Sequence, residues 1–141
     1  MKFQRASFFS AITLAILATA GCATMSNSSG VKLSGSQEVP AVSSMASGSG
    51  AIMVAADKLV SGSITTMGIE GKAAHIHQGA MGANGPVVVP LTKTGDNTWS
   101  VPAGAKLTDA QYAAYQAGGM YVNVHSAANP GGEIRGQLAG K

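Results

Sequence analysis

Two of the three histidines in this chain stand two residues apart, in the stretch AAHIHQ. Successive side chains of a strand point to opposite faces, so a strand here places His75 and His77 on one face, about 7 Å apart at Cα. The third histidine, His125, follows in the stretch MYVNVH, where polar and apolar residues alternate. The same alternation puts His125 and Asn123 on the polar face of their strand. The three imidazoles are therefore predicted to lie on polar faces of two strands.

Three neutral imidazoles are a known ligand set for Zn²⁺ and Cu²⁺, and they leave a fourth position open to water or a substrate. The residues predict a site for one copper or zinc ion, made of His75, His77 and His125, with copper preferred because it stands above zinc in the affinity order. An open copper position suggests metal handling, or redox chemistry on superoxide or peroxide. The alternative is a non-enzymatic interaction or structural module of the cell envelope, whose histidines form hydrogen bonds and hold no ion.

Motifs of other functional classes are missing from the sequence. It contains no G-x-S-x-G nucleophile elbow and no G-x-x-x-x-G-K-[ST] phosphate loop. Charged residues make up 11% of the chain, and its lysines and arginines do not cluster with aromatic residues. We therefore expect no nucleic-acid partner and assign no catalytic residue outside the histidine group.

The N-terminus, residues 1–21, has the layout of a secretory signal. Two basic residues precede an apolar run, residues 8–20, that is too short to span a bilayer. The stretch LATAGC that follows resembles a bacterial lipoprotein box, which makes Cys22 the lipidated mature N-terminus. Ala23 stands where lipoproteins kept at the inner membrane carry aspartate, so the resemblance implies attachment to the outer membrane, facing the periplasm, through the lipid alone. Cleavage after Ala20 by an ordinary signal peptidase is the alternative and would release the protein into the periplasm.

The remainder of the chain predicts a tether and one domain. Residues 22–30 are small and polar and predict a flexible tether, and residues 31–141 suffice for a single core. Eight short runs separated by turn residues predict strands, and LTDAQYAAYQAGG predicts a helix with Thr108 as its N-cap and Gly118 as its stop. We expect an all-β fold, an antiparallel Greek-key-like β-sandwich or flattened barrel of about eight short strands with one short helix. The serine- and glycine-rich run at 43–50 predicts a mobile loop.

A second polar group accompanies the histidines. In GEIRGQL, Glu133 and Arg135 alternate with apolar residues, and Arg135 is the only arginine after the signal segment. Such a face in a small domain predicts a paired structural network, to which we assign Glu38 and Asn123 as well. The loop QGAMGANGP beside the histidine pair predicts a stiff connection that could cover the site, or simply a tight turn.

Three long stretches together resemble the CHRD domain, a module first described in chordin and common in exported bacterial proteins. They are LSGSQEVPAV (33–42), AAHIHQGAMGANGPVVVPL (73–91) and MYVNVHSAANPGGEIRGQL (120–138). The resemblance runs from about Val31 to Leu138 and includes the positions of His75, His77, Asn123, His125, Glu133 and Arg135. It implies no particular reaction, because the family is described by its domain. The partner expected from the sequence is a metal ion. A homodimer whose two chains share the ligands of one site is the alternative to a site within a single chain.

Overall fold

The computed structural model describes residues 28–140 of the chain. The predicted signal segment and Cys22 lie outside the described residues, as do residues 22–27 of the predicted tether. The remaining three residues of that tether, 28–30, are the start of the first strand, which begins at Ser28 instead of Val31. They extend the strand because they pair in register with residues 51–53 of the next one.

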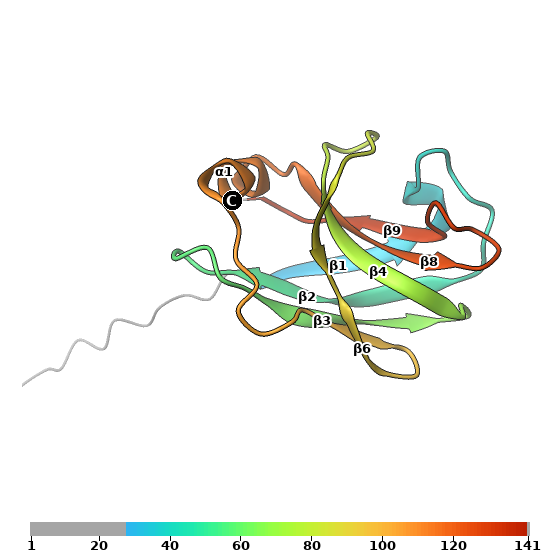
Figure 1. The fold of residues 1–141 in the computed structure, drawn as a ribbon. Coiled ribbons are helices and arrows are strands. Elements are labelled where there is room, and N and C mark those ends of the chain that lie inside the picture. The colour runs from blue at the N-terminus through green and yellow to red at the C-terminus, as the bar shows by residue number, and fades with distance from the viewer. Residues whose placement is uncertain (1–27, 141) are drawn as a thin grey trace, which may run out of the picture.

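Nine strands, one α-helix and one short 3-10 helix make up the described chain (Figure 1). In chain order they are β1 (Ser28–Ser34), η1 (Gly35–Gln37), β2 (Ser47–Val54), β3 (Val60–Met67), β4 (Gly71–Gln78), β5 (Val87–Pro90), β6 (Thr92–Gly95), β7 (Thr98–Ser100), α1 (Asp109–Gln116), β8 (Met120–Ser126) and β9 (Ile134–Gln137). None of the helices among residues 28–140 has the length and apolar character that crossing a membrane requires.

All nine strands belong to one antiparallel sheet that curls into a nearly closed, flattened barrel. Their order is β5-β4-β8-β9-β1-β2-β3-β7-β6, so β5 and β6 form its two edges. These edge strands are consecutive in the chain and are separated by Leu91 alone. The two edges of the sheet therefore come together at Leu91, whose N–H donates to the Ala74 carbonyl at 2.9 Å. The predicted all-β fold is confirmed.

Alternation along each strand determines which side chains fill the barrel. Ile52, Ile64, Val122, Val124 and Ile134 are all fully buried and face inward. Each such side chain stabilises the fold by about 1.5–3 kcal/mol through removal of apolar surface from water. Val122 and Val124 thus place one face of β8 in the core, and Asn123 between them must point outward.

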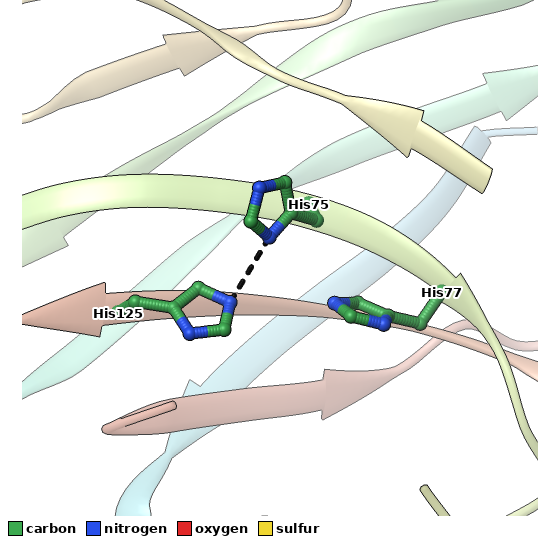
Figure 2. A group of neighbouring side chains, drawn as sticks. All are labelled: His75, His77 and His125. Carbon is green, nitrogen blue, oxygen red and sulfur yellow. Dashed lines mark hydrogen bonds between the residues drawn. The ribbon is translucent and has the colours of Figure 1, made fainter. Parts of the chain in front are cut away.

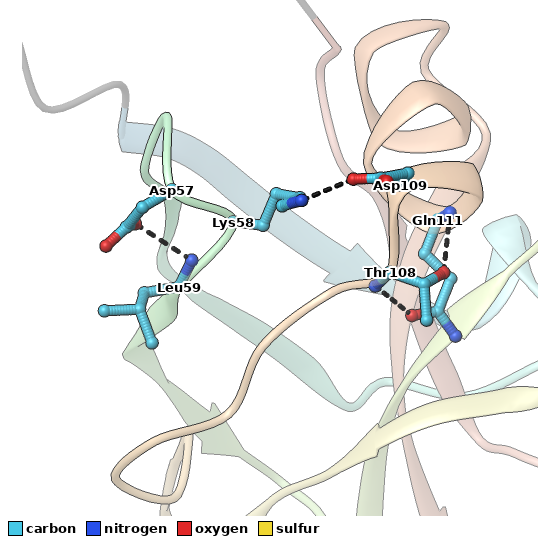
Figure 3. Close-up of polar contacts among 6 residues, drawn as sticks. All are labelled: Asp57, Lys58, Leu59, Thr108, Asp109 and Gln111. Atoms are coloured by element: carbon cyan, nitrogen blue, oxygen red, sulfur yellow. Dashed lines mark hydrogen bonds and ion pairs between the residues drawn. The ribbon is translucent and has the colours of Figure 1, made fainter.

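The predicted helix is present with the predicted ends. Thr108 caps α1 by accepting a hydrogen bond from the Gln111 N–H, and the Gln111 side chain accepts from the Thr108 N–H in return (Figure 3). Asp109 in the first turn pairs with Lys58 of the β2–β3 turn, which ties the helix to that loop (Figure 3). Gly118 ends the helix with φ of 74°, a conformation that glycine adopts without strain.

Two segments differ from the expected elements. Strand β6 is not among the predicted strands, because its sequence TKTG shows no apolar alternation. In the structure all four of its residues are exposed. The run at 43–50 is only partly a loop, since Ser47 to Gly50 belong to β2 and pair with both β1 and β3. This segment of β2 needs small residues because β1 and β3 lie close on either side of it. A Cβ at Gly50, for example, would overlap the backbone of Ser63.

Candidate metal centre

The centre lies on the outer face of the β4–β8–β9 part of the sheet. In the antiparallel register, His75 lies opposite Asn123, which lies opposite Arg135 on β9. One row further along, His77 lies opposite Tyr121. Because side chains directly opposite each other on one face are about 4.5–5.5 Å apart at Cβ, this register assembles one polar cluster from residues about 50 positions apart.

The three histidines meet within this cluster (Figure 2). Each contributes one ring nitrogen, and these three atoms lie within 4.8 Å of one another. His75 Nδ1 and His125 Nε2 are 3.0 Å apart, and the ring centroids of His75 and His77 are 5.5 Å apart. The three imidazoles therefore lie close enough to hold one metal ion.

Two backbone carbonyls determine which nitrogens face inward. His77 Nδ1 lies 2.9 Å from the Gly85 carbonyl oxygen and His125 Nδ1 lies 2.9 Å from that of Pro130. A carbonyl only accepts, so in each ring Nδ1 donates its proton and Nε2 of the neutral ring carries the lone pair. Second-shell bonds of this kind orient histidine ligands in metal sites.

One hydrogen bond within the cluster joins two of the three rings. His75 Nδ1–H can donate to the His125 Nε2 lone pair across their 3.0 Å contact. His77 Nε2 has no hydrogen-bond partner, although the residue is only 8% exposed. A buried unpaired polar atom costs about 1–3 kcal/mol, so a hydrogen-bond donor or a metal ion at this lone pair would stabilise the cluster.

The distances between the ring nitrogens can be compared with those of a bound metal ion. Three nitrogens bound at about 2.0–2.1 Å in a tetrahedral arrangement are about 3.4 Å from one another. His75 Nδ1 and His125 Nε2, 3.0 Å apart, are already near this value. The largest separation among the three ligand nitrogens is within 4.8 Å, and a pair at that limit would have to approach by over 1 Å to bind one ion. Imidazole donors suit both copper and zinc, so the set does not select between the two metals.

Burial keeps the ligand rings in their neutral form. Desolvation, followed by the neighbouring His125 and His77 rings, lowers the pKa of His75 below its ordinary value. Desolvation also lowers the pKa of His77, against an opposing effect of the hydrogen bond to Gly85. Neutral imidazole is the form that binds metal, so both rings have their lone pairs available at neutral pH.

The loop 79–86 covers the His77 side of the centre. The Gly85 carbonyl accepts from His77, and its N–H donates to the Tyr121 hydroxyl at 3.2 Å. A Cβ at Gly85 would overlap the Gln78 carbonyl, so only glycine allows the loop to lie this close to β4. The loop is held from the far side by Asn84, whose side-chain amide donates to the Val39 carbonyl at 2.8 Å. This loop therefore positions the His77 ring in addition to turning the chain.

Tyr121 connects the histidines to Arg135. Its ring stacks on the His77 ring with centroids 4.8 Å apart and planes within 3° of parallel. The Arg135 guanidinium lies over the Tyr121 ring, 3.4 Å from its centroid. Arg135 also donates to Asn84 and to the Ala83 carbonyl, at 3.2 and 2.8 Å. The only arginine of the domain thus anchors the covering loop and the stack together.

The four residues assigned to a structural network lie in two separate groups. Glu38, Asn123 and Arg135 are all buried, and Arg135 and Asn123 both act on the Glu38 carboxylate. Desolvation nevertheless dominates and raises the pKa of Glu38. Glu133 instead accepts from Ser44 Oγ at 2.7 Å and from Ser126 Oγ, and these bonds lower its pKa. Within residues 28–140 no ion pair joins Glu133 to Arg135.

Three residues that complete the centre were not assigned to it from the sequence. Tyr121 shares the outer face of β8 with His125, so its strand parity was a usable signal. Gly85 and Asn84 act through the covering loop, and no local pattern reports where a loop folds back.

Comparison with known proteins identifies the domain. The family model described as CHRD domain matches residues 30–138, most of the chain. Neither the curated proteins nor the solved structures contain a match. The matched range includes the three histidines and every side chain described above.

Proposed function

The chain belongs to the CHRD domain family, and we propose that this member binds one copper or zinc ion through His75, His77 and His125. The observation that carries the proposal is the buried His77 Nε2, which has no hydrogen-bond partner and faces the other two ligand nitrogens. Carbonyls hold two of the three rings in the tautomer that aims Nε2 at the cluster. A site prepared in this way favours an ion over a purely hydrogen-bonded group.

Three histidine ligands leave a coordination position for an exogenous group. With copper, such a position supports binding and delivery of the ion, and redox chemistry on superoxide or peroxide follows as a secondary activity. With zinc, the ion contributes stability and no redox chemistry. The proposed role is therefore metal handling in the cell envelope.

The second candidate is a metal-free interaction or structural module. The 3.0 Å contact between His75 and His125 favours it, because this contact satisfies two rings without an ion. It leaves His77 Nε2 unexplained, and for that reason we rank it second.

Metal analysis of the purified mature protein tests the choice. The wild-type protein should take up one equivalent of Cu²⁺ or Zn²⁺, and the variants His75→Ala and His125→Ala should lose it. Thr66→Val is a matched control, because it removes a buried polar group that is bonded to the Asn97 carbonyl, outside the cluster. A folded wild-type protein without stoichiometric metal would establish the second candidate instead.

We also propose export and lipidation at Cys22, which would place the domain on the periplasmic side of the outer membrane. The support is the resemblance of LATAGC to a lipoprotein box. Mass spectrometry of the mature N-terminus distinguishes a diacylglyceryl group on Cys22 from a free Gly21 end, and the latter result would refute lipidation.

A further inference from the structure

Asn123 presents a second unpartnered atom beside the proposed ion. Its side chain is 3% exposed, and its carbonyl oxygen Oδ1 has no hydrogen-bond partner. Asn123 lies opposite His75 in the strand register and two residues from His125 on the same face. A buried amide oxygen without a donor costs about 1–3 kcal/mol, as the His77 lone pair does.

This oxygen and the His77 lone pair belong to the same cluster. Asn123 and Tyr121 alternate along β8, and their partners on β4 are His75 and His77, so Asn123 Oδ1 and His77 Nε2 are unpartnered acceptors on neighbouring rows of one face. In the neutral ring the His77 proton is on Nδ1, bonded to Gly85, and Nε2 is an acceptor as well. Two acceptors cannot bond to each other, so each needs a donor or a cation from outside the pair.

Glu38 lies on the amide-nitrogen side of Asn123. The Asn123 amide nitrogen is 2.7 Å from the place where a Cβ on Gly132 would lie. Glu38 Oε1 lies 2.5 Å from the same position. The amide nitrogen is thus directed to the carboxylate side, and Oδ1 is left for the histidine side.

We infer that Asn123 Oδ1 accepts a hydrogen bond from a water molecule bound at the open position of the ion. The inference rests on the proposed function, since it requires an ion on His77 Nε2. A hydrated cation supplies both missing partners: the metal takes the nitrogen lone pair, and its water donates to the amide oxygen. Asn123 is therefore a positioning residue. It favours O–H donors, such as water or hydrogen peroxide, over anions at the open position of the ion.

The test uses the Cu²⁺-loaded mature protein and azide as an anionic probe. Pulsed electron–nuclear double resonance in D₂O and H₂O should show exchangeable protons on a copper-bound water in the wild-type protein. Asn123→Leu has a similar volume and removes the acceptor. It should bind azide, followed by its charge-transfer absorption, about fivefold to tenfold more tightly, the equivalent of one lost hydrogen bond. Thr66→Val should leave azide affinity unchanged.

The outcomes separate this inference from the proposed function. A protein that binds no copper refutes the proposed function. Copper bound without exchangeable protons, or equal azide affinity in wild type and Asn123→Leu, refutes the role of Asn123 alone. A structure in which the Asn123 amide nitrogen donates to His77 Nε2 refutes it as well. If Asn123→Leu does not fold, Asn123→Ala takes its place in the azide titration, and an azide affinity equal to that of the wild type would again refute the role of Asn123.

Discussion

Replacement of His77 by phenylalanine should abolish stabilisation by metal and leave the metal-free domain almost as stable as the wild type. The phenyl ring preserves the stack on Tyr121 and the volume beneath the loop. It removes the Nδ1–H bond to the Gly85 carbonyl and also the unpaired Nε2 atom. Each change is worth about 1–3 kcal/mol with opposite sign, so the free energy of unfolding of the metal-free variant should lie within about 1 kcal/mol of wild type.

The metal-loaded proteins should differ much more. A ligand at 100 times its Kd stabilises the folded state by about 2.7 kcal/mol. In a domain of this size, 1 kcal/mol shifts Tm by about 3–6 °C, so Zn²⁺ should raise the Tm of the wild type by about 10 °C. The assay is thermal unfolding followed by circular dichroism, with Zn²⁺ or with chelator.

The matched control is Tyr115→Phe. Tyr115 OH is also buried without a hydrogen-bond partner, but it belongs to α1, outside the cluster. This variant should keep the full response to Zn²⁺, while His77→Phe should show none. An equal increase in Tm in His77→Phe and wild type would refute the assignment of His77 as a ligand.

Four further measurements follow from the contacts described. The metal-free domain should lose stability as the pH falls below about 6.5, because folding lowers the pKa values of His75 and His77 and the unfolded chain therefore takes up protons first. Urea unfolding at pH 7.5 and 5.0 checks this, and a higher free energy of unfolding at pH 5.0 would contradict it. Tyr121→Phe keeps the stack and loses the bond from the Gly85 N–H, so Zn²⁺ affinity measured by calorimetry should fall about threefold to tenfold, and unchanged affinity would show that this bond does not position His77. Arg135→Leu removes the hydrogen-bond donor of the Ala83 carbonyl and the positive charge beside Glu38. The free energy of unfolding, measured in urea, should fall by about 3 kcal/mol, and a loss below about 1 kcal/mol would contradict the anchoring role of Arg135. Thr108→Ala removes the helix cap and should reduce stability by about 1 kcal/mol with Zn²⁺ affinity unchanged; a change in affinity would mean that α1 contributes to the centre.

Local alternation was sufficient to predict much of this domain. The parity of AAHIHQ and MYVNVH placed His75, His77 and His125 on polar strand faces, and the structure confirms this. The helix ends were equally predictable, because Thr108 and Gly118 act through bonds to their own neighbours in the chain. Parity and capping are short-range properties, so a sequence read alone contains them.

Tertiary structure decided the remaining features. Only the pairing of β4 with β8 places His75 next to His125, and that pairing depends on a sheet whose strand order does not follow the chain. Only the folded loop shows that Gly85 selects the tautomer of His77. Strand β6 likewise exists because β7 pairs with it, since its own residues are exposed and show no pattern. Contacts between distant segments set these features, because neither a strand partner nor the path of a loop is encoded by the periodicity of a single segment.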